Sequence, residues 1–319
     1  MTMNDKHFFT GALRPTTLAD FIGHEGIKAQ LAICLEAARR QKTALGHLLF
    51  YGPPGIGKTT LALIMAKEMA TTFYHTSGPA LRRLTDIDSC LKLCAPEKGD
   101  VFFVDEIHAL SRAAQEVLYP VMEQGKLITA IKGTSVNIAL QPFSVIGCST
   151  RIGKLSEPLL ARFKLVLRLD YYEPGDMFSI AQRSAKLLKL DVTNEALQEV
   201  AKRARGTPRE ANRILWFAKQ YQIAKRSGRI DLSLCREILR QLSIDQLGLQ
   251  EIDRRLLQTL MQLDRAVGLN HLAAALSEDK STIQDAIEPF LLRQGLLART
   301  ARGRVITPKG IQHLSKATP

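Results

Sequence analysis

The sequence predicts an α/β protein whose N-terminal half is a parallel sheet with helices on both faces. Short apolar runs alternate with helical segments up to about residue 170, which is typical of such a sheet. Residues 171–243 show only helical spacing of apolar residues, and residues 244–319 combine helical segments with a glycine-containing hairpin. We therefore expect three domains, which cover residues 1–170, 171–243 and 244–319.

Composition places the chain among ordinary globular proteins and excludes several classes. Of its 319 residues 45% are hydrophobic and 24% are charged. No apolar stretch is long enough to span a bilayer, and the polar N-terminus lacks the apolar core of a signal peptide. Five scattered cysteines without metal-site spacing are expected to be reduced thiols. These features predict a cytoplasmic protein without a membrane partner.

Five apolar runs are the predicted strands of the sheet: Leu48–Tyr51, Phe73–Thr76, Val101–Val104, Ser144–Cys148 and Val166–Leu169. The first run is followed directly by a phosphate-binding pattern, G-x-x-x-x-G-K-[ST], which reads Gly52-Pro53-Pro54-Gly55-Ile56-Gly57-Lys58-Thr59. Residues from Thr60 to Met69 continue with helical spacing. A chance glycine-rich turn is the alternative, but strand, loop and helix occur here in the required order.

This loop indicates a nucleotide site with defined roles. The glycines let backbone N–H groups surround a phosphate at a helix N-terminus, where the helix dipole favours negative charge. Lys58 would reach the β- and γ-phosphates, and the Thr59 hydroxyl would ligate Mg²⁺.

Two carboxylates at the end of a second buried strand strengthen the prediction. Asp105 and Glu106 follow the apolar run Val101–Val104, and parallel sheets bind ligands at the carboxyl ends of their strands. Asp105 would hold Mg²⁺ and Glu106 would polarise the attacking water. An isolated acidic pair is more often a solvated strand end, so the phosphate loop upstream decides in favour of nucleotide hydrolysis.

Further polar residues occupy informative positions. Ser149 and Thr150 follow a predicted strand and would lie near the γ-phosphate. Arg162 precedes the last predicted strand, from which an arginine can reach a neighbouring subunit's nucleotide. Arg209 lies at the start of a helix, after Pro208, and could fold back onto the phosphates. Spacing alone also allows surface salt bridges for both arginines.

The C-terminal segment has the pattern of a winged helix. Helices are expected at Glu251–Leu263, Asn270–Leu276 and Thr282–Gln294, the last with Ser281 as N-cap, and two strands flank the turn Thr300–Gly303. The basic wing residues are Arg299, Arg302 and Arg304, and the chain carries a net charge of +13. This predicts contact with DNA phosphates; a solvated basic hairpin is the alternative.

The chain resembles the RuvB family, the AAA+ motors of the bacterial Holliday-junction branch-migration complex, from about Leu13 to Lys309. The stretches that carry the resemblance, besides the phosphate loop, are Arg14-Pro15, Phe21-Ile22-Gly23, Thr76-Ser77-Gly78-Pro79, Val104-Asp105-Glu106-Ile107-His108, Leu118-Tyr119-Pro120, Arg205-Gly206-Thr207-Pro208-Arg209, Ala211-Asn212-Arg213, Leu272-Ala273-Ala274-Ala275 and Arg302-Gly303-Arg304.

The resemblance implies an AAA+ P-loop domain, an all-α helical lid and a C-terminal winged helix. It implies a homo-hexamer on double-stranded DNA that hydrolyses ATP with Mg²⁺, and a junction-binding partner, RuvA. By the same resemblance Ser149 or Thr150 is the first sensor, Arg162 the trans-acting arginine finger and Arg209 the second sensor. The implied nucleotide contacts also include Thr60 and an adenine site formed by Arg14, Pro15, Phe21, Ile22 and Tyr172.

Departures from the family pattern motivate alternatives. His24 stands where the family usually has Gln, and Ala301 replaces the usual Pro of the wing. The hairpin that contacts RuvA in the family is shortened here to Lys126–Leu140, with Ile128, Ile131, Val136 and Ile138 as a candidate apolar face. One alternative is thus a RuvB-derived loader or remodeller with another partner. Another is a nucleotide-gated DNA-binding regulator, against which the intact Glu106 and Arg162 argue.

Overall fold

The computed structural model describes residues 11–81, 83–94, 96–131 and 134–316, and the chain forms two compact units that divide after Tyr172. The first unit contains a five-stranded sheet in the order β2-β3-β6-β1-β7, and every neighbouring pair is parallel. The strands are β1 (Leu48–Tyr51), β2 (Phe73–Ser77), β3 (Val101–Asp105), β6 (Ser144–Ser149) and β7 (Leu165–Arg168). The predicted parallel α/β fold is confirmed.

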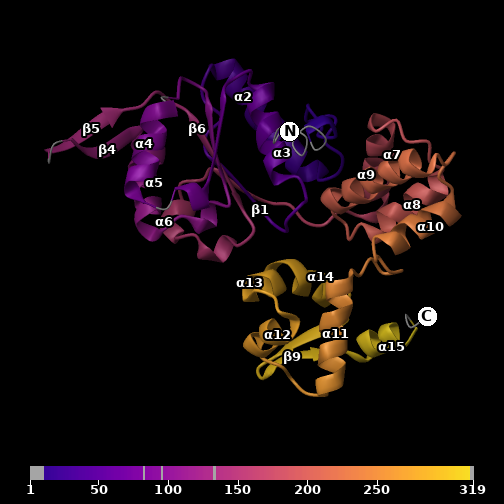
Figure 1. Ribbon diagram of the computed structural model, residues 1–319. Coiled ribbons are helices and arrows are strands. Elements are labelled where there is room, and N and C mark those ends of the chain that lie inside the picture. The colour runs from indigo at the N-terminus through magenta and orange to yellow at the C-terminus, as the bar shows by residue number, and fades with distance from the viewer. Residues whose placement is uncertain (1–10, 82, 95, 132–133, 317–319) are drawn as a thin grey trace. The chain divides into compact units, whose positions relative to one another are not determined.

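Helices cover both faces of this sheet (Figure 1), as the alternation of segments predicts. They are α2 (Glu25–Gln41), α3 (Lys58–Glu68), α4 (Leu84–Cys94), α5 (Arg112–Gln124) and α6 (Glu157–Leu160), with 3₁₀ turns at Gly78–Ala80, Ile107–Ala109 and Ile152–Lys154. Leu49, Phe102 and Val145 pack with α4 and α5, whereas α3 contacts β3 and β6. Because the inner strands β1, β3 and β6 are buried on both sides, their polar residues are confined to the strand ends.

A hairpin of β4 (Lys126–Ile131) and β5 (Thr134–Ala139) projects from this unit (Figure 1). Leu127 pairs with Ile138 and Ile128 pairs with Asn137, so the two isoleucines lie on opposite faces. Leu127 and Ile138 belong to the core, whereas Ile128 is 50% exposed. The predicted single apolar face is therefore wrong for Ile128, because strand side chains alternate. Residues 132 and 133 and the side chain of Ile131 lie outside the described part.

The second unit begins with the helices α7 (Pro174–Leu187), α8 (Asn194–Arg203), α9 (Pro208–Lys225) and α10 (Leu232–Gln241). Side-chain caps start two of them: Thr193 accepts from the Ala196 N–H and Asp231 from the Leu234 N–H. Helix α7 starts at Pro174, close to the predicted boundary between the first two domains. Pro at the first helical position explains this start.

The winged helix completes the second unit. Its elements are α11 (Glu251–Leu263), α12 (Leu269–Leu276), α13 (Lys280–Thr282), a π-helical turn (Ile283–Ile287), α14 (Glu288–Arg293), β8 (Leu297–Thr300), β9 (Gly303–Ile306) and α15 (Pro308–Lys316). The third helix starts two residues earlier than predicted, with Asp279 rather than Ser281 at the N-cap. The π turn lies just before Pro289, whose missing N–H removes one i→i−4 hydrogen bond.

Candidate functional site

The phosphate loop joins strand β1 to helix α3, and close approaches require two of its glycines. Gly52 has φ 140°, and a Cβ there would lie 2.0 Å from the Leu169 carbonyl oxygen. Gly57 has φ 105°, caps α3, and faces the ring of Phe21, which a Cβ would approach to 3.1 Å. The loop therefore wraps tightly before the N-terminus of α3, whose first N–H groups suit an anion.

Lys58 points back into the loop that precedes it. Its side chain is buried at 7% exposure, and Nζ donates to the carbonyl oxygens of Gly52 at 2.9 Å and Pro53 at 2.7 Å. These bonds hold the ammonium group inside the curve of the loop, where a phosphate would bind. This position is compatible with the predicted role of Lys58.

Thr59 and Asp105 come together from α3 and the end of β3. The Thr59 hydroxyl donates to Asp105 Oδ2 at 3.4 Å, and Asp105 Oδ1 accepts from the Glu106 N–H at 3.0 Å. Two adjacent hard oxygen donors fit Mg²⁺, which needs few protein ligands because waters and phosphates supply the rest. The described ranges contain no group of three or more His, Cys, Asp and Glu that could hold a metal alone.

Glu106 occupies a left-handed turn after β3, with φ 48° and ψ 43°. Its Oε2 accepts from the Thr150 hydroxyl at 3.2 Å and lies 3.2 Å from His108 Nδ1. The fully buried Ser149 hydroxyl also contacts His108 Nδ1 at 3.2 Å. Thr150 therefore reaches the acid directly, whereas Ser149 reaches it through His108. In the sequence, His108 stands out only as part of a motif. The structure brings its ring into contact with two residues of the candidate site.

An aromatic group from distant segments borders the loop. Phe21 and Tyr172 are buried, and the Tyr172 hydroxyl donates to the Ile56 carbonyl at 3.0 Å. The ring of His24 contacts Tyr172 edge-on at a centroid distance of 4.7 Å. The half-buried residues Arg14, Pro15 and Ile22 belong to the same N-terminal segment as Phe21. His24 is a neighbour of the site that sequence reasoning noted only as a departure.

Arg162 lies apart from this cluster, at the end of α6. Its guanidinium donates to the Pro158 carbonyl at 2.6 Å and to Glu123 Oε2 at 2.8 Å, and it covers the Tyr119 ring at 4.5 Å. These partners present the arginine on α5 and α6 rather than at the chain's own phosphate loop. Such a position is compatible with the predicted role in a neighbouring copy.

In the second unit, the turn before α9 is fixed by the winged helix. Arg205 has φ 58°, forms an ion pair with the buried Asp253 and donates to the Gly248 carbonyl at 2.8 Å. Burial raises the pKa of Asp253, and the positive charge of Arg205 opposes this effect. Arg209 follows in the exposed first turn of α9. Arg205, quoted only as part of a motif, thus bridges the helical part and the winged helix.

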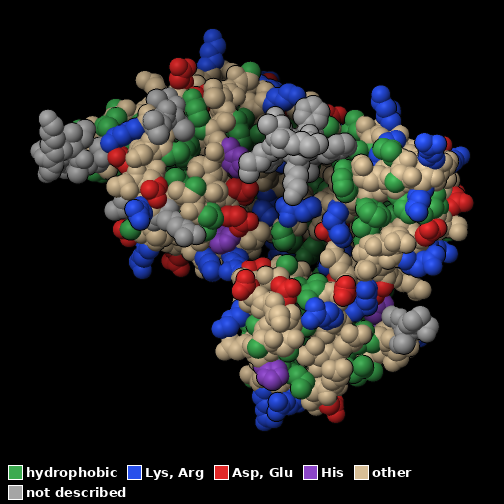
Figure 2. All heavy atoms as spheres, viewed as in Figure 1, with side chains coloured by type: hydrophobic (Ala, Val, Ile, Leu, Met, Phe, Trp, Pro, Cys, Tyr) green, Lys and Arg blue, Asp and Glu red, His purple; other side chains and the backbone are tan. Residues whose placement is uncertain are grey.

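The wing arginines have unequal surroundings. Glu288 is fully buried at the start of α14, and its carboxylate accepts from Arg299 Nε at 2.9 Å and from Arg304 Nε at 2.6 Å. Arg302, at the turn, is exposed and forms no ion pair within the described part of the chain. Figure 2 shows basic side chains gathered at the tip of the winged-helix part. The wing therefore presents Arg302 outward, while Arg304, at 14% side-chain exposure, is directed inward.

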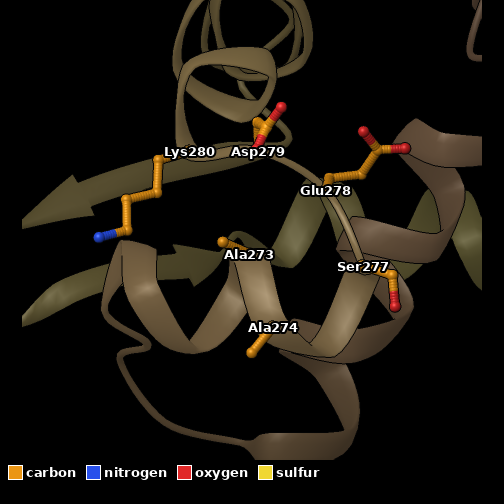
Figure 3. Close-up of a pocket in the computed structure, with 6 residues that line it drawn as sticks. All are labelled: Ala273, Ala274, Ser277, Glu278, Asp279 and Lys280. Atoms are coloured by element: carbon orange, nitrogen blue, oxygen red, sulfur yellow. The ribbon is translucent and has the colours of Figure 1, made fainter.

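An open hollow lies at the turn between α12 and α13, lined by Ala273, Ala274, Ser277, Glu278, Asp279 and Lys280 (Figure 3). The carboxylates of Glu278 and Asp279 point away from α12, and Lys280 extends to the other side. Two carboxylates at the start of the third helix disfavour close approach of phosphates. The wing is therefore the better-suited polyanion contact of this unit.

The parallel sheet, the phosphate loop and the paired acids at its carboxyl edge define a P-loop ATPase of the AAA+ class. Family models match at residues 13–169 (Holliday junction DNA helicase RuvB P-loop domain), 172–245 (RuvB AAA lid domain) and 246–315 (RuvB C-terminal winged helix domain). The chain belongs to the RuvB family.

Individual relatives agree with this assignment. The chain is 47% identical over 314 residues to the Holliday junction branch migration complex subunit RuvB of Chloroflexus aggregans, covering 97% of this chain and 89% of that protein. The Thermotoga maritima RuvB branch migration motor matches with a TM-score of 0.86 and 40% identity, covering 97% of this chain and all of that one. The FIGL-1 AAA domain, at 18% identity, a TM-score of 0.53 and coverage of 72% and 85%, shares only the fold. No helix within the described ranges is long and apolar enough to cross a membrane.

Proposed function

We propose that this chain is an ATP-hydrolysing motor that moves double-stranded DNA during Holliday-junction branch migration. The observation that supports it most is the convergence of Lys58, the Thr59–Asp105 pair and Glu106 at one edge of the sheet. Phosphoryl transfer needs positioned charges more than covalent chemistry, and this edge provides them. Membership of the RuvB family, whose named relatives are branch-migration proteins, supports the substrate.

Different residues of the chain bind the phosphates, the adenine and Mg²⁺ and orient the attacking water. The loop from Gly52 to Thr60 and Lys58 bind the phosphates, while Phe21 and Tyr172, with Arg14, Pro15 and Ile22, border the adenine. Thr59 and Asp105 would hold Mg²⁺, which neutralises charge on the phosphate oxygens when bound. Glu106 orients the attacking water, and Thr150 and Ser149 sense the γ-phosphate.

Arginines from two further places complete the proposed site. Arg162 would act in the site of a neighbouring copy, because its contacts with Glu123 and Tyr119 present it on α5 and α6. Arg209 would approach the phosphates from the first turn of α9. The role of Arg162 requires a closed homo-oligomer, for which we propose a hexamer.

The remaining assignments follow the same proposal. The P-loop domain covers residues 1–170, the lid 171–243 and the winged helix 244–319. DNA meets the wing through Arg302, with Arg299 and Arg304 beside it, and the hairpin of β4 and β5 meets a RuvA-like junction-binding protein. The complex would act in the cytoplasm, where the chromosomal DNA is.

The first experiment measures ATP hydrolysis alone, with duplex DNA, and with DNA plus the RuvA protein of the same source. Turnover that rises in both later arms supports the proposal. Absence of turnover in every arm would refute the enzyme assignment. The Glu106→Gln variant is the control, because it should bind ATP without hydrolysing it.

A loader or remodeller with another partner is the second candidate. The observation that favours it is the hairpin, whose Ile128 is half exposed on the face opposite to Ile138. Turnover that rises with DNA but does not respond to RuvA would support this candidate over the first.

A further inference from the structure

We propose that His108 is a positioning residue for Glu106: its Nδ1–H holds the carboxylate that orients the attacking water, and the buried Ser149 fixes the ring. This inference rests on the proposed ATPase function and deepens it. It concerns a residue that contacts Glu106 and not the nucleotide.

One hydroxyl donor and one imidazole nitrogen from separate segments lie within 3.2 Å of the same oxygen of Glu106. Oε2 lies 3.2 Å from Thr150 Oγ1, which follows β6, and 3.2 Å from His108 Nδ1, in the turn after β3. The backbone of Glu106 is fixed as well, because Gly78 approaches its carbonyl so closely that a Cβ at Gly78 would lie 2.3 Å from it. With the backbone fixed, the direction of the carboxylate depends on these two side chains.

The tautomer of His108 follows from its neighbours. A ring nitrogen with a bare lone pair would repel a carboxylate oxygen at 3.2 Å, whereas an N–H attracts it, so Nδ1 carries the proton. Ser149 Oγ accepts from the Arg151 N–H at 3.0 Å and lies 3.2 Å from the same Nδ1. Ser149 is fully buried and cannot move to solvent. It therefore keeps the imidazole ring directed at Glu106.

Burial, assisted by nearby cations, favours the neutral ring of His108. Burial lowers the pKa of His108 below 6.5, Glu106 raises it, and the cations Arg151, Lys154 and Lys58 lower it further. A neutral ring has one N–H, which the contact with Glu106 assigns to Nδ1. Glu106, with 43% of its side chain exposed, stays accessible to water while His108, at 11%, holds it from beneath.

The inference predicts a selective kinetic effect. The phosphates are bound by the loop and Lys58, so loss of His108 leaves ATP affinity unchanged. A misdirected Glu106 slows only the chemical step, and a misplacement of about 1 Å costs about 100-fold in rate. His108→Ala should thus lower kcat about 10- to 100-fold with an unchanged KM, in the range of such misplacements.

The matched control is His108→Asn, whose amide N–H takes the place of Nδ1–H and should restore most of kcat. Thermal melting of both variants separates positioning from folding. The inference is overturned if His108→Ala keeps the wild-type kcat, or if His108→Asn is as slow as His108→Ala while both melt like the wild type.

A second measurement needs neither nucleotide nor turnover. Nitrogen NMR of the full chain reports the His108 tautomer, and the signal is assigned as the one missing in His108→Asn. We expect protonated Nδ1 in the wild type and a shifted signal in Glu106→Gln. Protonated Nε2 would overturn the inference even in an active enzyme. Protonated Nδ1 in a chain without turnover would instead refute the proposed function and leave the contact established.

Discussion

The phosphate loop of the first unit and the wing of the second both carry cations that the sequence predicts to meet phosphates, but the two regions surround them differently. Lys58 donates to carbonyl oxygens of its own loop and stays directed at the phosphate position. Arg304 is instead paired with the buried Glu288. The buried carboxylate of Glu288 therefore competes with DNA phosphates for Arg304.

The difference has a local cause. The loop around Lys58 is a continuous segment, and its backbone supplies neutral carbonyls as partners. The wing has few backbone partners to offer, and Glu288 comes from α14, 11 residues before Arg299. A fully buried carboxylate must be neutralised by cations, so Glu288 forms ion pairs with the arginines that lie beside it.

The largest expected effect is the loss of ATP hydrolysis in Arg162→Ala. This variant tests whether an arginine that is paired with an acid can still interact with a phosphate. Arg162 forms an ion pair with Glu123, as Arg304 does with Glu288, but Arg162 is proposed to act in the nucleotide site of a neighbouring copy. Removing an arginine finger should lower kcat by about 10³- to 10⁵-fold, measured as steady-state ATP hydrolysis.

Oligomers assembled from a mixture of two inactive variants provide the control for this prediction. Arg162→Ala keeps Glu106, and Glu106→Gln keeps Arg162, so mixed oligomers should recover part of the activity that each variant lacks alone. No recovery in mixtures that assemble normally would contradict a role in trans.

Glu288→Ala tests whether the wing depends on its buried acid. The change leaves Arg304 without its carboxylate partner at 14% side-chain exposure, and breaking a buried pair costs about 3–5 kcal/mol of unfolding free energy. Denaturant unfolding measures it. Glu251→Gln, at an exposed position of α11, should change the free energy by less than about 0.5 kcal/mol. Equal stability of the two variants would show that Glu288 does not hold the wing.

The two wing arginines should differ in the salt dependence of DNA binding. Arg302→Ala removes an exposed cation and should reduce the slope of log K against log salt by about 0.9, one phosphate contact. Arg304→Ala should leave the slope near that of the wild type, because Arg304 is neutralised by Glu288. Titrations at several salt concentrations measure both. If Arg304→Ala lowers the slope as much as Arg302→Ala, the arginine leaves Glu288 to bind DNA.

The smallest effect is the pH dependence contributed by His47 in the first unit. Its Nε2 lies 2.8 Å from the Met122 carbonyl and its Nδ1 accepts from the Val145 N–H, so the ring is held neutral. Burial lowers the pKa of His47 below 6.5. The unfolded chain therefore binds a proton first as the pH falls through 6.5, and the unfolding free energy decreases there.

Melting curves between pH 7.5 and 5 measure this slope. His47→Gln, which does not titrate, should flatten it, whereas the substitution His271→Gln at an exposed position should not. An unchanged slope in His47→Gln would show that other groups carry the pH dependence.

Much of the first unit was predictable because its signals are local. The strands and the phosphate loop lie where continuous apolar runs and fixed glycines indicate, and α11 has the predicted bounds. The predicted N-cap of the third winged-helix helix was wrong, because both Asp279 and Ser281 are residue types that favour this position and the structure uses Asp279. The prediction that Ile128 belongs to the apolar face was wrong, because residue type alone does not determine on which face of a strand a side chain lies.

The sequence by itself determined the parallel sheet, the loop that binds phosphate and the order of acids after β3, since each depends on neighbours along the chain. Only the tertiary structure decided which polar and charged side chains contact one another. The pairing of β3 and β6 brings Ser149 to His108 and Thr150 to Glu106, and the folding of α14 against the wing pairs Arg304 with Glu288. Backbone conformation is set by local sterics, whereas the electrostatic role of a side chain is set by whichever distant charge packing brings within a few ångströms.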